Sequence, residues 1–271
     1  MKYLAPDFVT GLWLAWRARL FTVLFWIGMV LVVATLLGAQ FSGRQPATVA
    51  LDIGLSVIRL GLPLLIILLM QELFTREFDR RYYLTSLTAP QPRSHFLLGR
   101  FSALIILTFG AIIILGIILA ALVGYLSYYG YQQSTPVDLG LGYVVTLVFT
   151  AIDLFVIATL ALLISIVAVT PSFVLIGTLG FLLVSRSYSG IIALLENERY
   201  VVDNPELYRG SLGILYYLLP DLGALDVRRI SLYSKWEFLP ADWPGLVLST
   251  LAYALALLAL SIWLLGRKQF N

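Results

Sequence analysis

The chain has 271 residues, of which 60% are hydrophobic and only 12% charged, and its formal net charge is +3. A soluble domain carries roughly 25% charged residues, so this composition leaves too little polar surface to cover a globule in water and requires lipid as part of the solvent. The small net charge gives no indication of nucleic-acid binding, and the lack of cysteine excludes disulfides, thiolate metal sites and a cysteine nucleophile.

The first predicted element is an amphipathic helix over residues 7–20. Phe8, Leu12, Trp16 and Leu20 recur every four residues and form one apolar stripe. This pattern predicts a helix that lies in the membrane interface before the chain turns into the bilayer. The alternative is a slightly extended first span with an ordinary aromatic belt. The start lacks the order of charged, apolar and small residues of a cleavable signal peptide, so we expect the first apolar span to stay in the mature protein.

Six predicted membrane spans follow. A bilayer core of about 30 Å needs about 20 apolar residues of helix. Five segments meet this requirement, whereas the fifth in chain order is short, and we expect its outer end to be broken or to bend back. The six cover about residues 20–40, 50–74, 101–129, 141–170, 171–185 and 245–265. The sequence therefore predicts an all-α membrane protein with a single transmembrane domain over residues 1–271.

Basic residues set the predicted orientation. With six spans, ten of the eighteen lysines and arginines fall on the side of the two termini, whereas the first two loops of the other side hold only Arg44. Cytoplasmic loops are enriched in lysine and arginine, so both termini are expected in the cytoplasm.

The cytoplasmic segment between the second and third spans, residues 76–100, is the most polar connection. It contains five arginines together with acidic residues. Nothing in Arg76–Leu87 breaks a helix, and Pro90 and Pro92 end it, because proline lacks a backbone N–H and disfavours helix in the residue before it. The pattern predicts a short charged helix at the membrane surface, held between two rigid spans.

At these residues the sequence resembles the ABC-2 class of exporter permeases. That family carries an acidic residue, a short helix ending in a Leu-x-x-Pro-type turn, then an Arg and a Gly-Lys before the third span. The corresponding residues are Glu77, Leu84–Leu87, Pro90, Arg93 and Gly99-Arg100. Arginine thus replaces the usual lysine, and Pro92 stands where a small polar residue is common. Residues 216–222 also resemble a segment of the branch grouped with multicopper-enzyme maturation permeases.

The resemblance implies the transmembrane permease subunit of an ABC exporter in a bacterial inner membrane. The helix in residues 76–87 would be a coupling helix that docks on a separate cytoplasmic ATP-binding subunit. The residues expected at this contact are Glu77, Asp79, Arg80, Arg81 and Arg93. The alternative is that these arginines only satisfy the charge rule and contact lipid phosphate.

No cofactor is expected in this chain. None of its three lysines follows a glycine in a phosphate-binding loop, so ATP and Mg are expected on the partner subunit and the chain is not expected to be an enzyme. The resemblance also implies a second permease copy or a paralogue in the complex. Two other functions stay open, an ion-coupled carrier and a membrane anchor or scaffold without transport. A carrier is expected to have several buried acids and an internal repeat, which the sequence does not show.

Two ionisable residues inside the predicted spans form the remaining candidate site. Arg59 lies about 14 Å and Asp153 about 18 Å along their helices from the outer ends, at 1.5 Å per residue. Similar depth and opposite charge predict an intramembrane ion pair near the translocation path. The alternatives are that Arg59 snorkels outward, or that Asp153 is protonated and hydrogen-bonded to Thr146 or Thr150.

The outer segment, residues 186–242, mixes short apolar runs with acidic residues. The runs are too short to span a bilayer. We expect short re-entrant or interfacial helices that cap the outer mouth before the last span, and the alternative is a loop packed on the outer surface.

Overall fold

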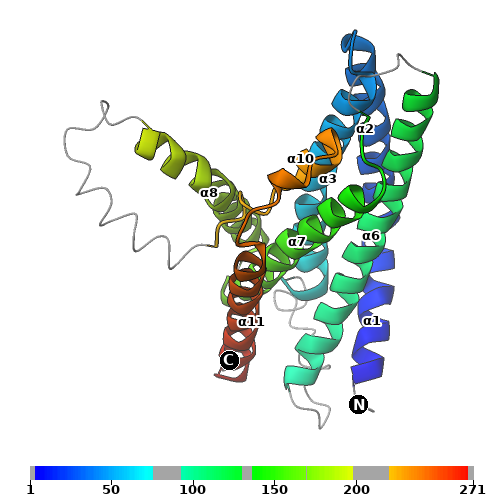
Figure 1. The fold of residues 1–271 in the computed structure, drawn as a ribbon. Helices are drawn as coiled ribbons and strands as arrows, with labels where there is room; N and C mark the ends of the chain where they lie inside the picture. Colours follow the sequence, from blue (N-terminus) through cyan, green and yellow to red (C-terminus); the bar gives the residue numbers. More distant parts are fainter. Residues whose placement is uncertain (1–3, 76–92, 130–135, 169, 198–219, 268–271) are drawn as a thin grey trace.

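The computed structural model describes residues 4–75, 93–129, 136–168, 170–197 and 220–267, and every regular element in these ranges is a helix (Figure 1). Five of the described helices are long and apolar enough to cross a membrane. They are α2 (Leu20–Phe41), α3 (Pro46–Met70), α6 (Arg93–Tyr129), α7 (Leu141–Val167) and α11 (Trp243–Arg267). The chain is therefore an all-α, multi-pass membrane protein, as predicted.

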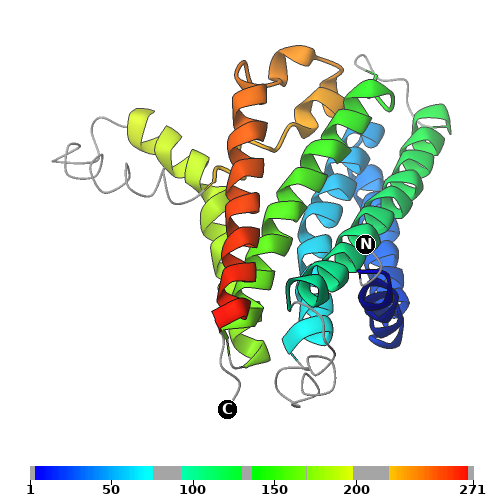
Figure 2. The same cartoon turned by 90° about the horizontal axis from the view of Figure 1, so that it is seen from below.

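Within the described residues, five helices rather than the predicted six meet the length and composition criteria for a membrane span, so the sixth span stays a prediction. The predicted span 171–185 falls in α8 (Pro171–Asn197), whose apolar part, Pro171–Ser187, is shorter than the other five. The helix also does not stop at Arg186. It continues to Asn197, and in both views its C-terminal half points away from the other helices (Figures 1 and 2).

The centre of the bundle is formed by α3 and α7. In each of them 56% of the apolar stretch is buried by other parts of the protein, against 17% in α2 and α11. The outer two helices therefore present most of their surface to lipid, which suits their nearly uniform apolar composition. Side chains that α3 and α7 turn toward each other are shielded from lipid, and this is where polar groups can be accommodated.

The predicted amphipathic helix is present as α1 (Leu4–Arg17), separated from α2 by Arg19 in a left-handed conformation with φ of 60°. In Figure 1 α1 runs lengthwise beside the first turns of α6, where Asp7 lies next to Gly99 and Gly11 lies next to Ala103. Its buried face is made by Gly11 and Ala15, and Trp13 and Trp16 are exposed. Exposed tryptophans on such a helix suit the headgroup layer of a membrane.

The longest helix, α6, begins eight residues before the predicted span at residue 101. Its 37 residues correspond to about 55 Å, far more than the bilayer core of about 30 Å. The turns before residue 101 are the ones on which α1 packs. Figure 1 also shows the N-terminal helix α1 and the C-terminal end of α11 at the same end of the molecule.

In the described residues between α8 and α11, 220–242, there are two short helices. They are α10 (Arg228–Tyr233) and the 3-10 helix η2 (Trp236–Phe238). The backbone N–H of Asp138 donates to the carbonyl of Ser231, and the Ser234 hydroxyl donates to the carbonyl of Pro136. α10 is thereby fixed to the chain that leads into α7, and Figure 2 shows it at the end of the bundle opposite to the C-terminal end of α11.

Candidate functional site

Four of the predicted ATPase-contact residues, Glu77, Asp79, Arg80 and Arg81, lie in residues 76–92, outside the described part of the chain. Arg93 is the first residue of α6, and its side chain is likewise outside the description. The docking surface itself stays a prediction. The elements on either side of it are described.

The two ends of this segment are joined by a buried arginine. On one side α3 runs into a π-helical turn, η1 (Gln71–Thr75), and on the other α6 begins. The Arg100 guanidinium donates to the carbonyl of Leu73 at 2.7 Å and lies 4.2 Å above the Phe96 ring. Only 4% of Arg100 is exposed. A charge-assisted hydrogen bond in such surroundings fixes the end of α3 to the start of α6.

The helix α1 packs closely on the same part of α6. A Cβ added to Gly99 would lie 2.7 Å from the Cβ of Asp7, and one added to Gly11 would lie 2.9 Å from the Cβ of Ala103. Glycine is needed at both places because the helices approach more closely than a side chain allows. The helix α1, the start of α6 and the end of α3 therefore form one packed unit next to residues 76–92.

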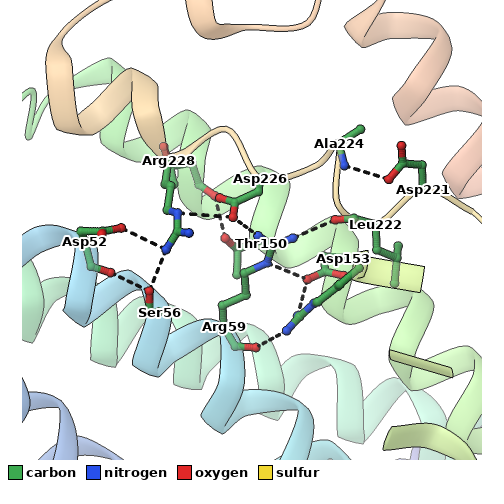
Figure 3. Close-up of polar contacts among 12 residues, drawn as sticks. Asp52, Ser56, Arg59, Thr150, Asp153, Asp221, Leu222, Ala224, Asp226 and Arg228 are labelled. Carbon is green, nitrogen blue, oxygen red and sulfur yellow. Dashed lines mark hydrogen bonds and ion pairs between the residues drawn. The ribbon is translucent and has the colours of Figure 1, made fainter. Parts of the chain in front are cut away.

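The structure brings the predicted intramembrane pair together. The Arg59 Nε lies 3.5 Å from Asp153 Oδ2, and Asp153 is 1% exposed. Arg59 does not snorkel outward, because its guanidinium also donates to the carbonyl of Leu222 at 2.7 Å. The hydroxyls of Thr146 and Thr150 donate to backbone carbonyls of α7 rather than to Asp153. Figure 3 shows the two charged groups meeting between their helices.

Arg186 is a closer partner of Asp153 than Arg59 is. Its Nη2 lies 2.5 Å from Asp153 Oδ2, and its Nη1 donates to the backbone carbonyl of Arg59 at 3.0 Å. The predicted fifth span ends at residue 185, so Arg186 was assigned to the outer segment and its pairing with Asp153 was not predicted. One signal for this role was available. Arg186 follows an apolar run that begins at Pro171, and an arginine at membrane depth needs a partner of opposite charge.

Three further residues extend the cluster toward the end of the bundle that carries α10. Asp226 pairs with both Arg59 and Arg228, and Arg228 pairs with Asp52 at 2.9 Å (Figure 3). We call these six residues the charge network: Asp52, Arg59, Asp153, Arg186, Asp226 and Arg228. One signal for it was missed, since Asp52, Ser56 and Arg59 lie on one face of α3 at spacings of four and three residues.

Part of the outer segment enters the bundle as non-helical chain. The carbonyl of Pro220 accepts from the Ser185 hydroxyl at 2.5 Å, and the N–H of Ala224 donates to Asp221 Oδ1 at 3.0 Å. Leu222 and Leu225 are buried. Since Arg59 binds the carbonyl of Leu222, residues 220–227 reach the level of Asp153, near the middle of α7. Irregular chain is tolerated at membrane depth when other protein groups satisfy its backbone, as they do here. Residues 220–227 therefore fold into the bundle as a series of turns that precedes the short helices, and their re-entry into the membrane stays a prediction.

The charges of the network balance, with three arginines against three aspartates contributed by α3, α7, α8, α10 and residues 220–227. Balanced, hydrogen-bonded charges can be kept in a bundle interior, whereas removing one partner leaves an uncompensated charge. In the part of the chain that the structure describes, no group of three or more His, Asp or Glu side chains suits a metal ion. Protein-family models and curated proteins give no match to the chain.

Proposed function

We propose that the chain is the transmembrane permease subunit of an ABC-type exporter, energised by ATP hydrolysis on a separate subunit. The proposal rests on the resemblance of residues 76–100 to the coupling segment of ABC-2 permeases. The packing around that segment supports it. Arg100 joins the end of α3 to the start of α6, and α1 packs on the start of α6. A force applied to residues 76–92 would therefore act on α3, α6 and α1 together, because coupling between sites is carried by rigid, packed elements.

The charge network supports a transport role independently of that resemblance. Ionisable residues within membrane helices face a bundle interior or a cavity, where they mark substrate or ion pathways or hold helices together. Non-helical chain at the same depth is a feature of transporters, in which broken elements line the binding site. Residues 220–227 and the network fit this description.

The proposed topology has six crossings and both termini in the cytoplasm of a bacterium. α8 would cross the inner half of the membrane as far as Arg186, and residues 220–227 would complete the crossing as re-entrant chain. Two observations support this. The N-terminal helix α1 and the C-terminal end of α11 lie at the same end of the molecule (Figure 1), and α10 lies at the opposite end from the C-terminus of α11 (Figure 2). In the complex, a second permease copy or a paralogue would complete the translocation path.

Co-purification from mild detergent tests the proposal. The chain should carry a nucleotide-binding subunit with it, and the double variant Arg80→Glu/Arg81→Glu should release that subunit, because reversed charges oppose docking. Arg44→Glu is the matched control, since it reverses an exposed arginine in the connection between α2 and α3, and it should retain the partner. Retention of the ATPase by the double variant would refute the assignment of the contact.

An ion-coupled carrier is the second candidate, and one observation favours it. The structure gathers three carboxylates, those of Asp52, Asp153 and Asp226, in one network. Each of them has an arginine partner, so the network offers a coupling cation no net negative charge. A carrier would move its substrate in proteoliposomes with an ion gradient and without any ATPase, whereas the exporter would need the partner subunit and ATP.

A further inference from the structure

Five residues of the charge network form a series of contacts along which the side chains become steadily less exposed. The exposed fractions of the side chains fall from Asp52 at 47% through Arg228 at 34%, Asp226 at 24% and Arg59 at 16% to Asp153 at 1%. Each residue contacts the next one in this series. The polar groups therefore lead continuously from the end of the bundle near α10 to the middle of α7.

A small cavity lies along this series. Its lining includes Arg59, Thr150, Asp153, Leu225, Asp226 and Arg228, and its volume is about 10 Å³. That is room for one water molecule. The cavity is polar, with hydroxyl, guanidinium and carboxylate groups in its wall, and cavities of this kind hold water whereas apolar ones stay dry.

One buried atom at this cavity lacks a partner within the protein. Asp153 Oδ2 receives both arginines, but Asp153 Oδ1 has no hydrogen-bond partner among the described residues. An unsatisfied carboxylate oxygen in a buried place is costly, so a donor is needed there. Thr150 does not supply it, because its hydroxyl donates to the carbonyl of Thr146.

We propose that this cavity is the inner end of a water-filled inlet, which opens beside Asp52 and Arg228 and ends at Asp153. A water molecule in the cavity donates to Asp153 Oδ1 and accepts from an arginine of the wall. The occupant is neutral, because the wall carries two arginines and two aspartates and offers neither a cation nor an anion a net attraction. The inlet lies within one chain, and it does not depend on the proposed ATPase partner.

Hydroxyl-radical footprinting by X-ray radiolysis tests the inlet on the native protein in nanodiscs. Radicals form from water and modify side chains next to it, so the modification rate of a buried residue reports water beside it. Leu225 and Val227 line the cavity and are 3% and 2% exposed. Leu62 and Val156 are the same residue types, buried to 0% exposure, and lie outside its wall. The inlet predicts several-fold faster modification of Leu225 and Val227 than of Leu62 and Val156. Equal rates would overturn it.

A filling variant separates water in the cavity from a generally loose structure. Thr150→Met places a larger apolar side chain in the cavity and should bring the modification rate of Leu225 down toward that of Leu62. Val148→Met is the control on the same helix, because Val148 faces outward, and it should leave the rate unchanged. A high rate at Leu225 that persists in folded Thr150→Met would overturn the proposal. Failure to co-purify an ATPase would count against the exporter and leave this result untouched.

Discussion

Asp153→Asn removes the charge at the centre of the network while it keeps the shape of the side chain. Arg59 retains its contacts with Asp226 and the carbonyl of Leu222, so the loss falls mainly on Arg186. In the described residues, Asp153 is the carboxylate that Arg186 contacts. Breaking a buried pair by removing one partner costs about 3–5 kcal/mol, and because Arg186 keeps one hydrogen bond we expect the lower end, about 3 kcal/mol.

The free energy of unfolding in mixed micelles, followed by circular dichroism as the denaturing detergent increases, measures this loss. Adding Arg186→Gln to Asp153→Asn should restore part of the stability, because the unpaired charge is removed as well. Asp52→Asn is the matched control. It breaks a pair at the exposed rim of the network and should cost less than about 1 kcal/mol. An Asp153→Asn variant within about 0.5 kcal/mol of the wild type, the range of an ordinary surface change, would refute the reasoning.

Two predictions concern the packed unit beside residues 76–92. Gly99→Ala should destabilise the protein by about 1–3 kcal/mol, because the added Cβ meets Asp7 and the backbone N of Phe8. Gly110→Ala on the same helix is the control. Its Cβ meets nothing within 4 Å, so this variant should be neutral or stabilising. Thermal unfolding of the two variants compares them, and equal melting temperatures would contradict the close packing of α1 on α6. Arg100→Met should cost about 2 kcal/mol through the loss of its bond to the Leu73 carbonyl, and it should weaken the link between ATP hydrolysis and transport in the reconstituted complex. An unchanged ratio of ATP hydrolysed to substrate moved would argue against that link.

Most of the helices could be predicted from hydrophobicity alone. α2 and α7 begin at the predicted residues, because a bilayer imposes one length and one composition on every span. The start of α6 could not be predicted in this way. Its first eight residues include four polar ones, Arg93, Ser94, His95 and Arg100, and α1 packs against this part of the helix. A contact between two protein surfaces leaves no mark on a hydropathy profile.

The candidate site shows the same division. The contact between Arg59 and Asp153 followed from depth arithmetic, since a rigid helix converts sequence distance into depth. Asp226 and Arg228 could not be placed, because their depth depends on how the re-entrant chain folds back against α3 and α7. The role of Arg186 was hidden for a related reason. An arginine in an apolar segment suggests that the span ends there. Arg186 can lie inside the bundle because Asp153, 33 residues earlier in the sequence, neutralises it.

The proposed function is tested most directly by a photocross-linking amino acid placed at Arg80 in living cells. Irradiation should join the chain to one soluble protein, and mass spectrometry should identify that protein by the phosphate-binding loop and Mg-binding acidic residue of an ATPase. Cross-links to lipid alone, to a protein without nucleotide-binding motifs, or to partners on the outer side of the membrane would contradict the permease proposal.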